Sequence, residues 1–188
     1  MKDHCSDPHE NLCWLDLETT GTDPLSDAIL EIGVTITTKR LMHVASFQRV
    51  VRPSRNTRIT EIDPFVWDMH NENDLWRESL RSKVSIDVAV NLAEKFIERH
   101  GAKGSPLCGN TISFDRSFLK AQTPEFLQCL HYRNIDVSTL KNVMAMHFPS
   151  VAPFDKPKGN HRVLEDLQLS IAEYEYYLQL MEDGECRQ

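Results

Sequence analysis

Long hydrophobic runs are absent from this chain of 188 residues. No window approaches the roughly 18 consecutive apolar residues that a membrane-spanning helix needs. Residues 1–10 are polar and lack the apolar core of a signal peptide. We therefore expect no membrane attachment, and we expect residues 1–10 to form a flexible N-terminal tail.

Paired cysteines are also missing. The five cysteines are an odd number, and no two of them form a CxxC pattern, which argues against a zinc site and against a disulfide framework. Cys13 and Cys108 lie within apolar runs, where a free thiol behaves as a small hydrophobic side chain. The cysteine usage favours a reducing compartment, so we expect a cytoplasmic protein.

Positive charge is scarce. The chain has 21 Lys and Arg against 28 Asp and Glu, and its net charge is −7. Long nucleic acids are usually bound by basic surfaces that release counterions, so this balance argues against a long electrostatic track. It does not exclude an enzyme of nucleic acids, because carboxylates that hold metal ions add to the negative count. A small ligand held in a pocket fits the charge better.

The order of periodic segments predicts the fold class. Three strands come first, then helices, then alternating strands and helices, which indicates an α/β fold with a mixed five-stranded sheet, an antiparallel meander of the first three strands and helices on both faces. The predicted strands are 11–17, 28–38, 41–51, 106–110 and 132–137, and the predicted helices are 61–81 in short pieces, 85–100, 113–121, 138–147 and 161–181. Without repeats or linkers, we expect one domain over residues 11–181 and a C-terminal tail over 182–188.

Two of these helices carry more detailed expectations. Ser138 or Thr139 is expected to cap its helix, because a hydroxyl can accept a hydrogen bond from the first free amides. The last helix should bury an apolar stripe against the sheet. That stripe comprises Leu164, Leu167, Ile171, Tyr174, Leu178 and Met181.

Two carboxylates stand at the end of the first predicted strand. Asp16 and Glu18 are two residues apart, so on a strand they point to the same face. Two carboxylates that share a face repel each other unless a cation lies between them, and a divalent metal is a natural partner. Gly21 permits a sharp turn directly after them. The alternative is that the strand has ended and both acids are solvated.

Three further residues can join this pair. Asp115 lies in the first turn of a helix that follows a strand, although an acid there also compensates the helix dipole. His161 and Asp166 are five residues apart, so on one regular helix they would diverge by roughly 140°. They can serve one site only if His161 precedes the regular turns, which Gly159 permits. The alternative for His161 is an exposed histidine at a helix start.

These five residues, in this order, match the three exonuclease motifs of the DEDDh superfamily. Asp16 with Glu18, then Asp115, then His161 with Asp166 resemble the motifs shared by proofreading exonucleases, RNase T and oligoribonucleases, and the resemblance covers about residues 11–181. It implies the RNase H-like exonuclease fold and hydrolysis of nucleic acids from the 3′ end.

Local segments resemble the oligoribonuclease branch in particular. Asn110 belongs to a CGN segment that precedes Asp115, and Tyr132 and Arg133 belong to an HYR segment that precedes DVSTLK. In that family, the residues matching Ser138 and Thr139 cap the 5′-phosphate of the substrate. The residue matching Arg133 reaches this phosphate from the other subunit of a homodimer, and Thr111 would join the cap, where the family usually has Ser.

The start of a helix suits a phosphate on physical grounds as well. Its amides and its dipole favour an anion, and an arginine adds a bidentate clamp. A cap at a fixed distance from the metal ions would select substrate length. The alternative is that Ser138 and Thr139 only cap the helix, with Asp136 supporting the turn.

Other matches are less regular. His70 lies in an HNENDL segment like the one whose histidine contacts the scissile-side phosphate in the family, with Asp74 where a glycine is usual. Phe65 or Trp67 would stack on a base, unless both rings belong to the core.

The first motif also departs from the oligoribonuclease pattern. Thr19 and Thr22 stand where that branch has Met and a Leu that wedges between bases. The DLETTG motif is closer to proofreading enzymes and RNase T. A broader 3′→5′ exonuclease acting on DNA or RNA ends is therefore the alternative function.

The resemblance implies a two-metal mechanism. Asp16, Glu18 and Asp166 would hold one Mg²⁺ or Mn²⁺, and Asp16 would bridge to a second ion with help from Asp115. His161 would take a proton from the attacking water, because histidine titrates near neutral pH.

The expected substrate is short single-stranded RNA, from dinucleotides to a few nucleotides, and the products are nucleoside 5′-monophosphates. The same chemistry would clear linear dinucleotides left from signalling molecules. A catalytically silent scaffold protein is the rival from another class.

Overall fold

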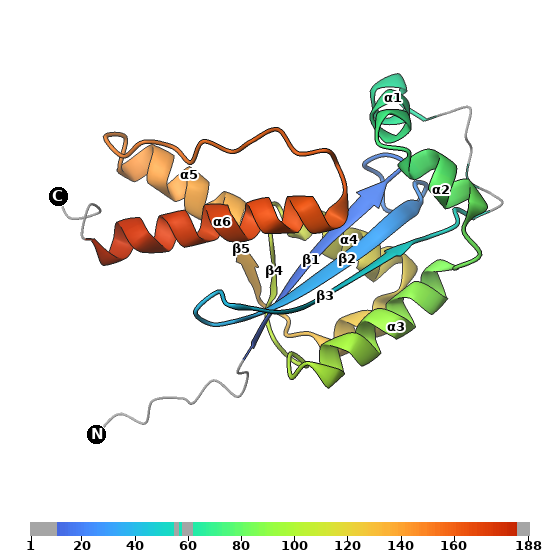
Figure 1. The fold of residues 1–188 in the computed structure, drawn as a ribbon, viewed down its shortest axis with the longest axis horizontal. Helices are drawn as coiled ribbons and strands as arrows, with labels where there is room; N and C mark the ends of the chain where they lie inside the picture. The colour runs from blue at the N-terminus through green and yellow to red at the C-terminus, as the bar shows by residue number, and fades with distance from the viewer. Residues whose placement is uncertain (1–10, 55–56, 58–61, 184–188) are drawn as a thin grey trace.

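The computed structural model describes residues 11–54, 57 and 62–183. Helices and strands follow one another much as the periodicity predicts (Figure 1). The elements are β1 Asn11–Thr19, β2 Ile29–Thr38, β3 His43–Val50, α1 Pro64–Glu72, α2 Leu75–Arg81, α3 Ile86–Arg99, β4 Leu107–Gly109, α4 Ser113–Gln122, the 3₁₀ helix η2 Pro124–Cys129, β5 Asn134–Asp136, α5 Val137–His147 and α6 Val163–Glu182. The prediction for residues 1–10 lies outside the described residues, as does most of the predicted C-terminal tail.

The five strands form one mixed sheet in the order β3-β2-β1-β4-β5. β1 pairs with β2 and β2 with β3 in antiparallel register, whereas β4 runs parallel to both β1 and β5. The predicted antiparallel meander of the first three strands is therefore confirmed, and so is the mixed α/β class.

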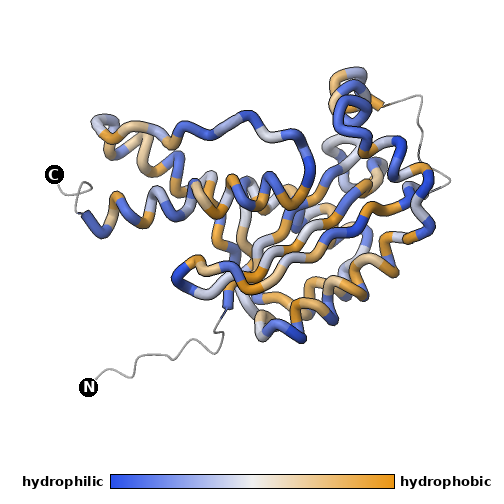
Figure 2. The backbone as a smooth tube through the Cα atoms, in the orientation of Figure 1, coloured by the Kyte–Doolittle hydropathy of each residue, from blue (hydrophilic) through white to orange (hydrophobic). Residues whose placement is uncertain are grey.

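Strand β1 divides the core into two halves. Cys13, Leu15 and Leu17 belong to the cluster shared with α3, α4 and η2, whereas Leu12 and Trp14 belong to the cluster shared with α5 and α6. Helices thus cover both faces of the sheet (Figure 1), and Figure 2 shows the hydrophobic residues gathered in the central strands. Because side chains alternate along a strand, the even-numbered residues that follow Trp14 face α6.

Helix α6 begins directly against the backbone of β2. A Cβ atom on Gly33 would lie 2.6 Å from the Cβ of Val163, so only glycine allows this approach. Gly33 is also the cross-strand partner of Asp16. The absence of a side chain at Gly33 therefore brings the start of α6 over the first-motif carboxylate.

The predicted apolar stripe of α6 is wrong in part. Leu167 is buried, but Met181 is 43% exposed, and two polar residues take part in the buried face. The buried residues are Val163, Leu167, Ser170, Glu173, Tyr177 and Leu180. Polar residues occupy this face because Asn110 donates hydrogen bonds to both Ser170 and Glu173, which removes the penalty for burying them.

The cap of α5 also differs from the prediction. The helix begins at Val137, and its N-cap is Asp136, whose carboxylate accepts a hydrogen bond of 3.0 Å from the amide of Ser138. Ser138 and Thr139 therefore lie inside the first turn rather than before it. Capping by Asp136 leaves their hydroxyls available for other partners.

Helices of the described chain are too short or too polar to cross a membrane.

Candidate active site

The two first-motif carboxylates lie at the end of β1, where the sheet opens. β4 pairs with β1 only at Cys13 and Trp14, so the strands separate before Leu17. The amide of Leu17 donates instead to the Asp115 carboxylate at 2.9 Å. This bond brings the first turn of α4 to the carboxyl end of β1, the place where α/β sheets usually bind ligands.

His161 and Asp166 reach the same place from the start of α6. Side-chain ligand atoms of Glu18, His161 and Asp166 all lie within 4.8 Å of one another. α6 begins only at Val163, and His161 has a left-handed backbone with a φ of 55°. His161 thus precedes the regular turns, which is the condition under which residues five positions apart can face one site.

Gly159 packs its backbone against the third-motif carboxylate. A Cβ atom at this position would collide with Oδ1 of Asp166. The loop before α6 therefore covers Asp166 with main chain alone, and any side chain at Gly159 would displace either the loop or the carboxylate.

Burial raises the pKa values of the four clustered carboxyls, and neighbouring carboxylate charges raise those of Asp16 and Glu18 further. Burial, and then the neighbouring charge of Asp166, raises the pKa of Glu18 to about 8. Burial raises the pKa of Asp115 to about 8, against the opposing effect of two backbone hydrogen bonds. Burial and the Asp115 charge raise the pKa of Asp16 well above its ordinary value, and burial also raises the pKa of Asp166.

This donor set fits a divalent cation. Four carboxyls lie close together at the end of β1, and burial raises the pKa of each of them. Hard oxygen ligands are those that Mg²⁺ and Mn²⁺ prefer. A bound cation would relieve the repulsion that the protein itself leaves in place.

Glu31 lies on the same face as Glu18, but its charge is neutralised by an arginine. The sequence analysis missed this residue. Glu31 is the cross-strand partner of Glu18 and is fully buried. Arg162 donates to it from Nη2 at 2.8 Å and from Nε at 3.1 Å, and Gln48 donates at 2.5 Å. A glutamate inside an apolar strand was the available signal, but its arginine lies 131 residues away along the chain.

His70 contacts the end of β1. Its side chain is 1% exposed, its Nε2 atom lies 2.9 Å from the carbonyl of Thr19, and the same atom is 4.0 Å from the Glu18 carboxylate. Burial lowers the pKa of His70, which favours the neutral ring. Because the carbonyl can only accept, Nε2 carries the proton in this arrangement.

The two candidate base-stacking rings differ in exposure. Phe65 is 71% exposed on α1, whereas the ring of Trp67 packs 5.1 Å from that of Trp76 in a small core cluster. Thr22 is exposed, and the hydroxyl of Thr19 donates to the carbonyl of Gly21 within the turn. Of the two rings, Phe65 has the larger surface available to a ligand.

The predicted phosphate-cap residues form a second polar group. The hydroxyl of Ser138 lies 3.0 Å from that of Thr111 and donates to Asn110 at 3.1 Å. The Thr111 amide donates to both Ser138 and Asp136, and Thr111 has a φ of 50°. Thr139 lies in the same first turn of α5, with an exposed side chain.

A chain of hydrogen bonds connects this group to the acidic cluster. Asn110 accepts from Ser138 and donates to the Ser170 hydroxyl at 3.0 Å. Ser170 in turn donates to the carbonyl of Asp166 at 2.9 Å. The cap is therefore linked to the backbone of Asp166 through one turn of α6, about 6 Å along the helix axis.

Glu173 anchors the same connection from within the core. Its side chain is 1% exposed and accepts from Asn110 at 3.1 Å and from Tyr177 at 3.4 Å. The ammonium groups of Lys141 and Lys156 lie 3.7 and 3.6 Å from its carboxylate. The sequence analysis missed this residue because it expected only apolar residues on the buried face of α6.

Tyr132 and Arg133 lie on the surface before β5. Tyr132 is 72% exposed, and the guanidinium of Arg133 stands 5.4 Å from the centre of its ring. The expectation that Arg133 acts across a subunit boundary stays a prediction.

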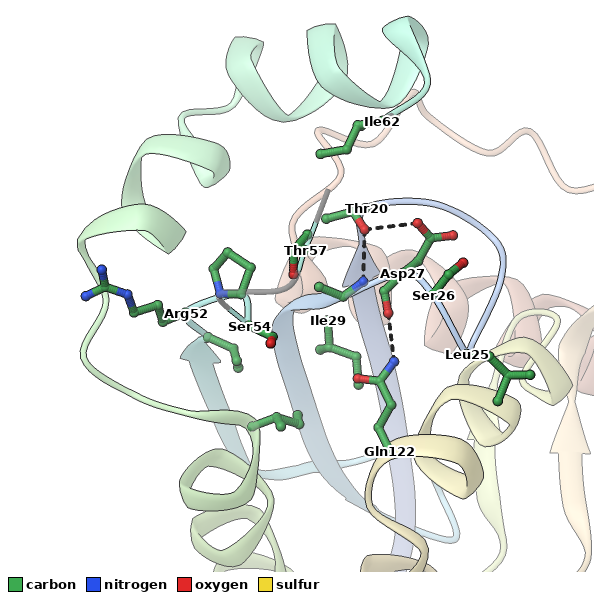
Figure 3. Close-up of a pocket in the computed structure, with 14 residues that line it drawn as sticks. Thr20, Leu25, Ser26, Asp27, Ile29, Arg52, Ser54, Thr57, Ile62 and Gln122 are labelled. Carbon is green, nitrogen blue, oxygen red and sulfur yellow. Dashed lines mark hydrogen bonds between the residues drawn. The ribbon is translucent and has the colours of Figure 1, made fainter. Parts of the chain in front are cut away.

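A cavity of about 650 Å³ lies beside the turn that follows β1 (Figure 3). Asp27 accepts from the Thr20 hydroxyl at 3.2 Å, and Gln122 donates to the Asp27 carbonyl at 2.8 Å. No predicted site residue is among the described residues that line it. The hydrogen bonds of Thr20 and Gln122 to Asp27 hold the loop that follows Glu18.

The fold is that of exonucleases. An exonuclease I from Methylocaldum szegediense matches with a TM-score of 0.60 at 17% identity, over 94% of this chain and 42% of that one. The cell-death related nuclease 4 matches with a TM-score of 0.65 at 14% identity, over 94% of this chain and 65% of that one. The chain thus spans less than two thirds of each of these solved structures.

Sequence similarity is closer and covers whole proteins. A family model described as "Exonuclease" matches residues 13–174. The oligoribonuclease of Pseudoalteromonas atlantica is 37% identical over 171 residues, which are 90% of this chain and 94% of that protein. The oligoribonuclease of Hahella chejuensis is 37% identical over 169 residues, which are 89% of this chain and 93% of that protein. The chain belongs to the exonuclease family, and within it to the oligoribonucleases.

Proposed function

We propose that the protein is a metal-dependent 3′→5′ exoribonuclease that degrades short oligoribonucleotides, from dinucleotides to a few nucleotides, to nucleoside 5′-monophosphates. Membership of the exonuclease family and similarity to oligoribonucleases support the activity. The observation that carries it is the convergence of Glu18, His161 and Asp166 within 4.8 Å at the end of β1.

Asp16, Glu18, Asp115 and Asp166 are the proposed metal ligands. Two Mg²⁺ or Mn²⁺ ions held there would stabilise the charge that develops on the attacking and leaving oxygens of the phosphodiester. The raised pKa values of the four carboxyls support this assignment, because the cluster is unfavourable without a cation.

His161 is the proposed general base. It accepts a proton from the water that attacks phosphorus, the bond between phosphorus and the 3′-oxygen of the preceding nucleotide breaks, and this oxygen takes up a proton from solvent water. The 3′-terminal nucleotide leaves as a 5′-monophosphate, and the shortened chain keeps a 3′-hydroxyl. His161 lies among the carboxylates, so it can reach a water molecule positioned between them.

Ser138, Thr139 and Thr111 are the proposed cap for the 5′-phosphate, with Asn110 orienting the Ser138 hydroxyl. Capping of α5 by Asp136 supports this role, because it answers the alternative that Ser138 and Thr139 serve only as helix caps. The link from Asn110 to α6 fixes the spacing between the cap and the metal ligands, which favours substrates of one short length.

A homodimer completes the proposed cap, with Arg133 and the neighbouring Tyr132 contributed by the second subunit. The exposure of both side chains supports this arrangement. We further propose that Phe65 provides the stacking surface for a base, with Trp67 as the backing of α1. His70 acts near the scissile phosphate through its contact with Glu18.

The proposed exonuclease domain spans residues 11–181, and the proposed compartment is the cytoplasm. The three buried free cysteines among the described residues, Cys13, Cys108 and Cys129, are compatible with a reducing environment.

A broader exonuclease that also trims longer RNA or DNA is the second candidate. The exposed Thr22 favours it, because threonine is too short to wedge between two bases as a leucine would. Thr19 is likewise occupied within its own turn.

The test is a comparison of initial rates with Mn²⁺ on 5′-phosphorylated RNAs of two to seven nucleotides and on matching DNAs. A steep preference for the RNA dinucleotide is expected from the fixed cap. Rates that are flat with length, or higher on DNA, would move the assignment to the broader exonuclease.

A further inference from the structure

His161 has a backbone conformation that its own sequence does not favour. Its φ of 55° lies in the left-handed region, which is unfavourable for a residue with a Cβ atom. Such a conformation persists only where the surrounding structure holds it. The groups that hold it therefore determine where the imidazole stands.

Asn73, in the corner between α1 and α2, binds both carbonyls around this residue. Its Nδ2 donates to the carbonyl of Asn160 at 2.9 Å and to that of His161 at 2.7 Å. Its Oδ1 accepts from the amide of Leu75 at 3.0 Å, which fixes the amide orientation. One side chain thus uses its donor for the His161 loop and its acceptor for the start of α2.

Arg162 fixes the other side of the same turn. Its guanidinium donates to the buried Glu31 and, from Nη2 at 2.8 Å, to Glu78 on α2. Nη1 also donates to the backbone carbonyl of Asn73 at 3.4 Å. The residue after His161 is therefore tied to β2 and to the α1–α2 corner at once.

We propose that Asn73 and Arg162 form a clamp that positions His161 for proton transfer. The inference rests on the proposed function and deepens it, since it assigns positioning residues to the general base. Neither residue is among those proposed to bind metal or substrate. Asn73 acts on the carbonyls on either side of the His161 backbone, and Arg162 prevents the chain from rotating at the next residue.

Asn73→Asp tests the clamp at a single atom. Aspartate keeps the oxygen that accepts from Leu75 but replaces the Nδ2 donor with an oxygen that repels both carbonyls. We expect kcat to fall by roughly 10- to 100-fold, because a displacement of about 1 Å can cost that much, while KM changes little. Asn71→Asp is the matched control, since Asn71 is exposed and its side-chain amide donates to the Trp67 carbonyl within its own helix. It should keep the wild-type kcat.

The double variant Asn73→Asp with His161→Ala separates an effect through His161 from a general loss of structure. If Asn73 acts through His161, Asn73→Asp should cause no further loss of kcat in the His161→Ala background. Mn²⁺ affinity measured by calorimetry should match the wild type in Asn73→Asp, because the carboxylates stay in place. Additive losses, weakened Mn²⁺ binding or a normal kcat in Asn73→Asp would each overturn the clamp.

Failure of the proposed function gives a different pattern. An inactive wild-type protein, or a His161→Ala variant with normal turnover, would refute the general-base assignment itself. An active wild type with an inactive His161→Ala variant and an unaffected Asn73→Asp variant would refute the clamp alone.

Discussion

Glu18 and Glu31 face each other across β1 and β2, yet their surroundings are opposite. Glu31 is fully buried and receives hydrogen bonds from Arg162, Gln48 and the amide of Val163. Glu18 is surrounded mainly by other carboxyls, and its pKa is raised to about 8. Glu31 is thus neutralised by protein groups, whereas Glu18 belongs to the cluster of carboxyls for which we propose a bound cation.

The largest expected effect comes from removing a charge on the unneutralised side. Asp16→Asn should lower turnover on the order of 10³-fold and abolish high-affinity Mn²⁺ binding, because Asp16 is the proposed bridging ligand. The melting temperature of the metal-free protein should stay equal or rise, since one repelling charge is gone. Activity assays, calorimetry and thermal melts measure the three quantities.

Asp87→Asn, an equal change at an exposed position in the first turn of α3, is its control and should leave turnover and Mn²⁺ affinity unaltered. If Asp16→Asn instead destabilised the metal-free protein strongly, Asp16 would belong with Glu31 as a structural carboxylate.

His161→Ala should lower kcat by roughly 10²- to 10⁴-fold, the usual contribution of a general base. Mn²⁺ affinity should change by less than about tenfold, because four carboxylates remain. His43→Ala, at an exposed position on β3, serves as the control in both measurements. Loss of Mn²⁺ binding in His161→Ala would instead make this imidazole a metal ligand.

Removing the neutralised carboxylate should affect stability more than chemistry. Glu31→Gln leaves Arg162 without its buried partner, so we expect a loss of about 3–5 kcal/mol in the free energy of unfolding. Glu98→Gln breaks an ion pair with Lys103 at the surface and should cost at most about 1 kcal/mol. Chemical denaturation of the two variants measures the difference, and equal losses would show that the Glu31 pair is not special.

The last expected effect is a dependence of stability on pH and metal. The clustered carboxyls have raised pKa values in the folded protein, up to about 8 for Glu18 and Asp115. The folded state therefore holds protons that the unfolded chain releases, and stability without metal should fall as pH rises from about 4 to 8.

Mn²⁺ at 100 times its dissociation constant should restore about 2.7 kcal/mol, which is roughly 5–10 °C in melting temperature for a domain of this size. Melts at pH 5 and pH 8, with and without Mn²⁺, measure both effects. A metal-free protein that is more stable at pH 8 than at pH 5 would contradict the raised pKa values of the clustered carboxyls.

Sequence spacing predicted correctly the features that depend on residues close together in the chain. Alternation along a strand placed Asp16 and Glu18 on one face, and the five-residue spacing required His161 to precede the helix, as it does. The neutralising contacts could not be predicted this way. Glu31 meets Arg162 across 131 residues, and Asn73 meets the His161 carbonyl across 88.

The buried face of α6 was predicted only in part, for a related reason. Ser170 and Glu173 read as polar surface residues, and only their hydrogen bonds to Asn110, 60 and 63 residues away, make their burial favourable. Periodicity identifies which side chains are apolar, but it does not reveal which polar side chains find a partner after the chain has folded.

Gly33 has no functional group, yet the position of α6 depends on it. A Cβ atom at Gly33 would lie 2.6 Å from the Cβ of Val163, so a single added methyl group would push the start of α6 away from the sheet. Asp166 would move with the helix while Asp16 and Glu18 stayed on β1. Substitutions of Gly33 should therefore inactivate the protein, although glycine takes no part in the chemistry. Gly33 should tolerate mutation as poorly as the carboxylates themselves.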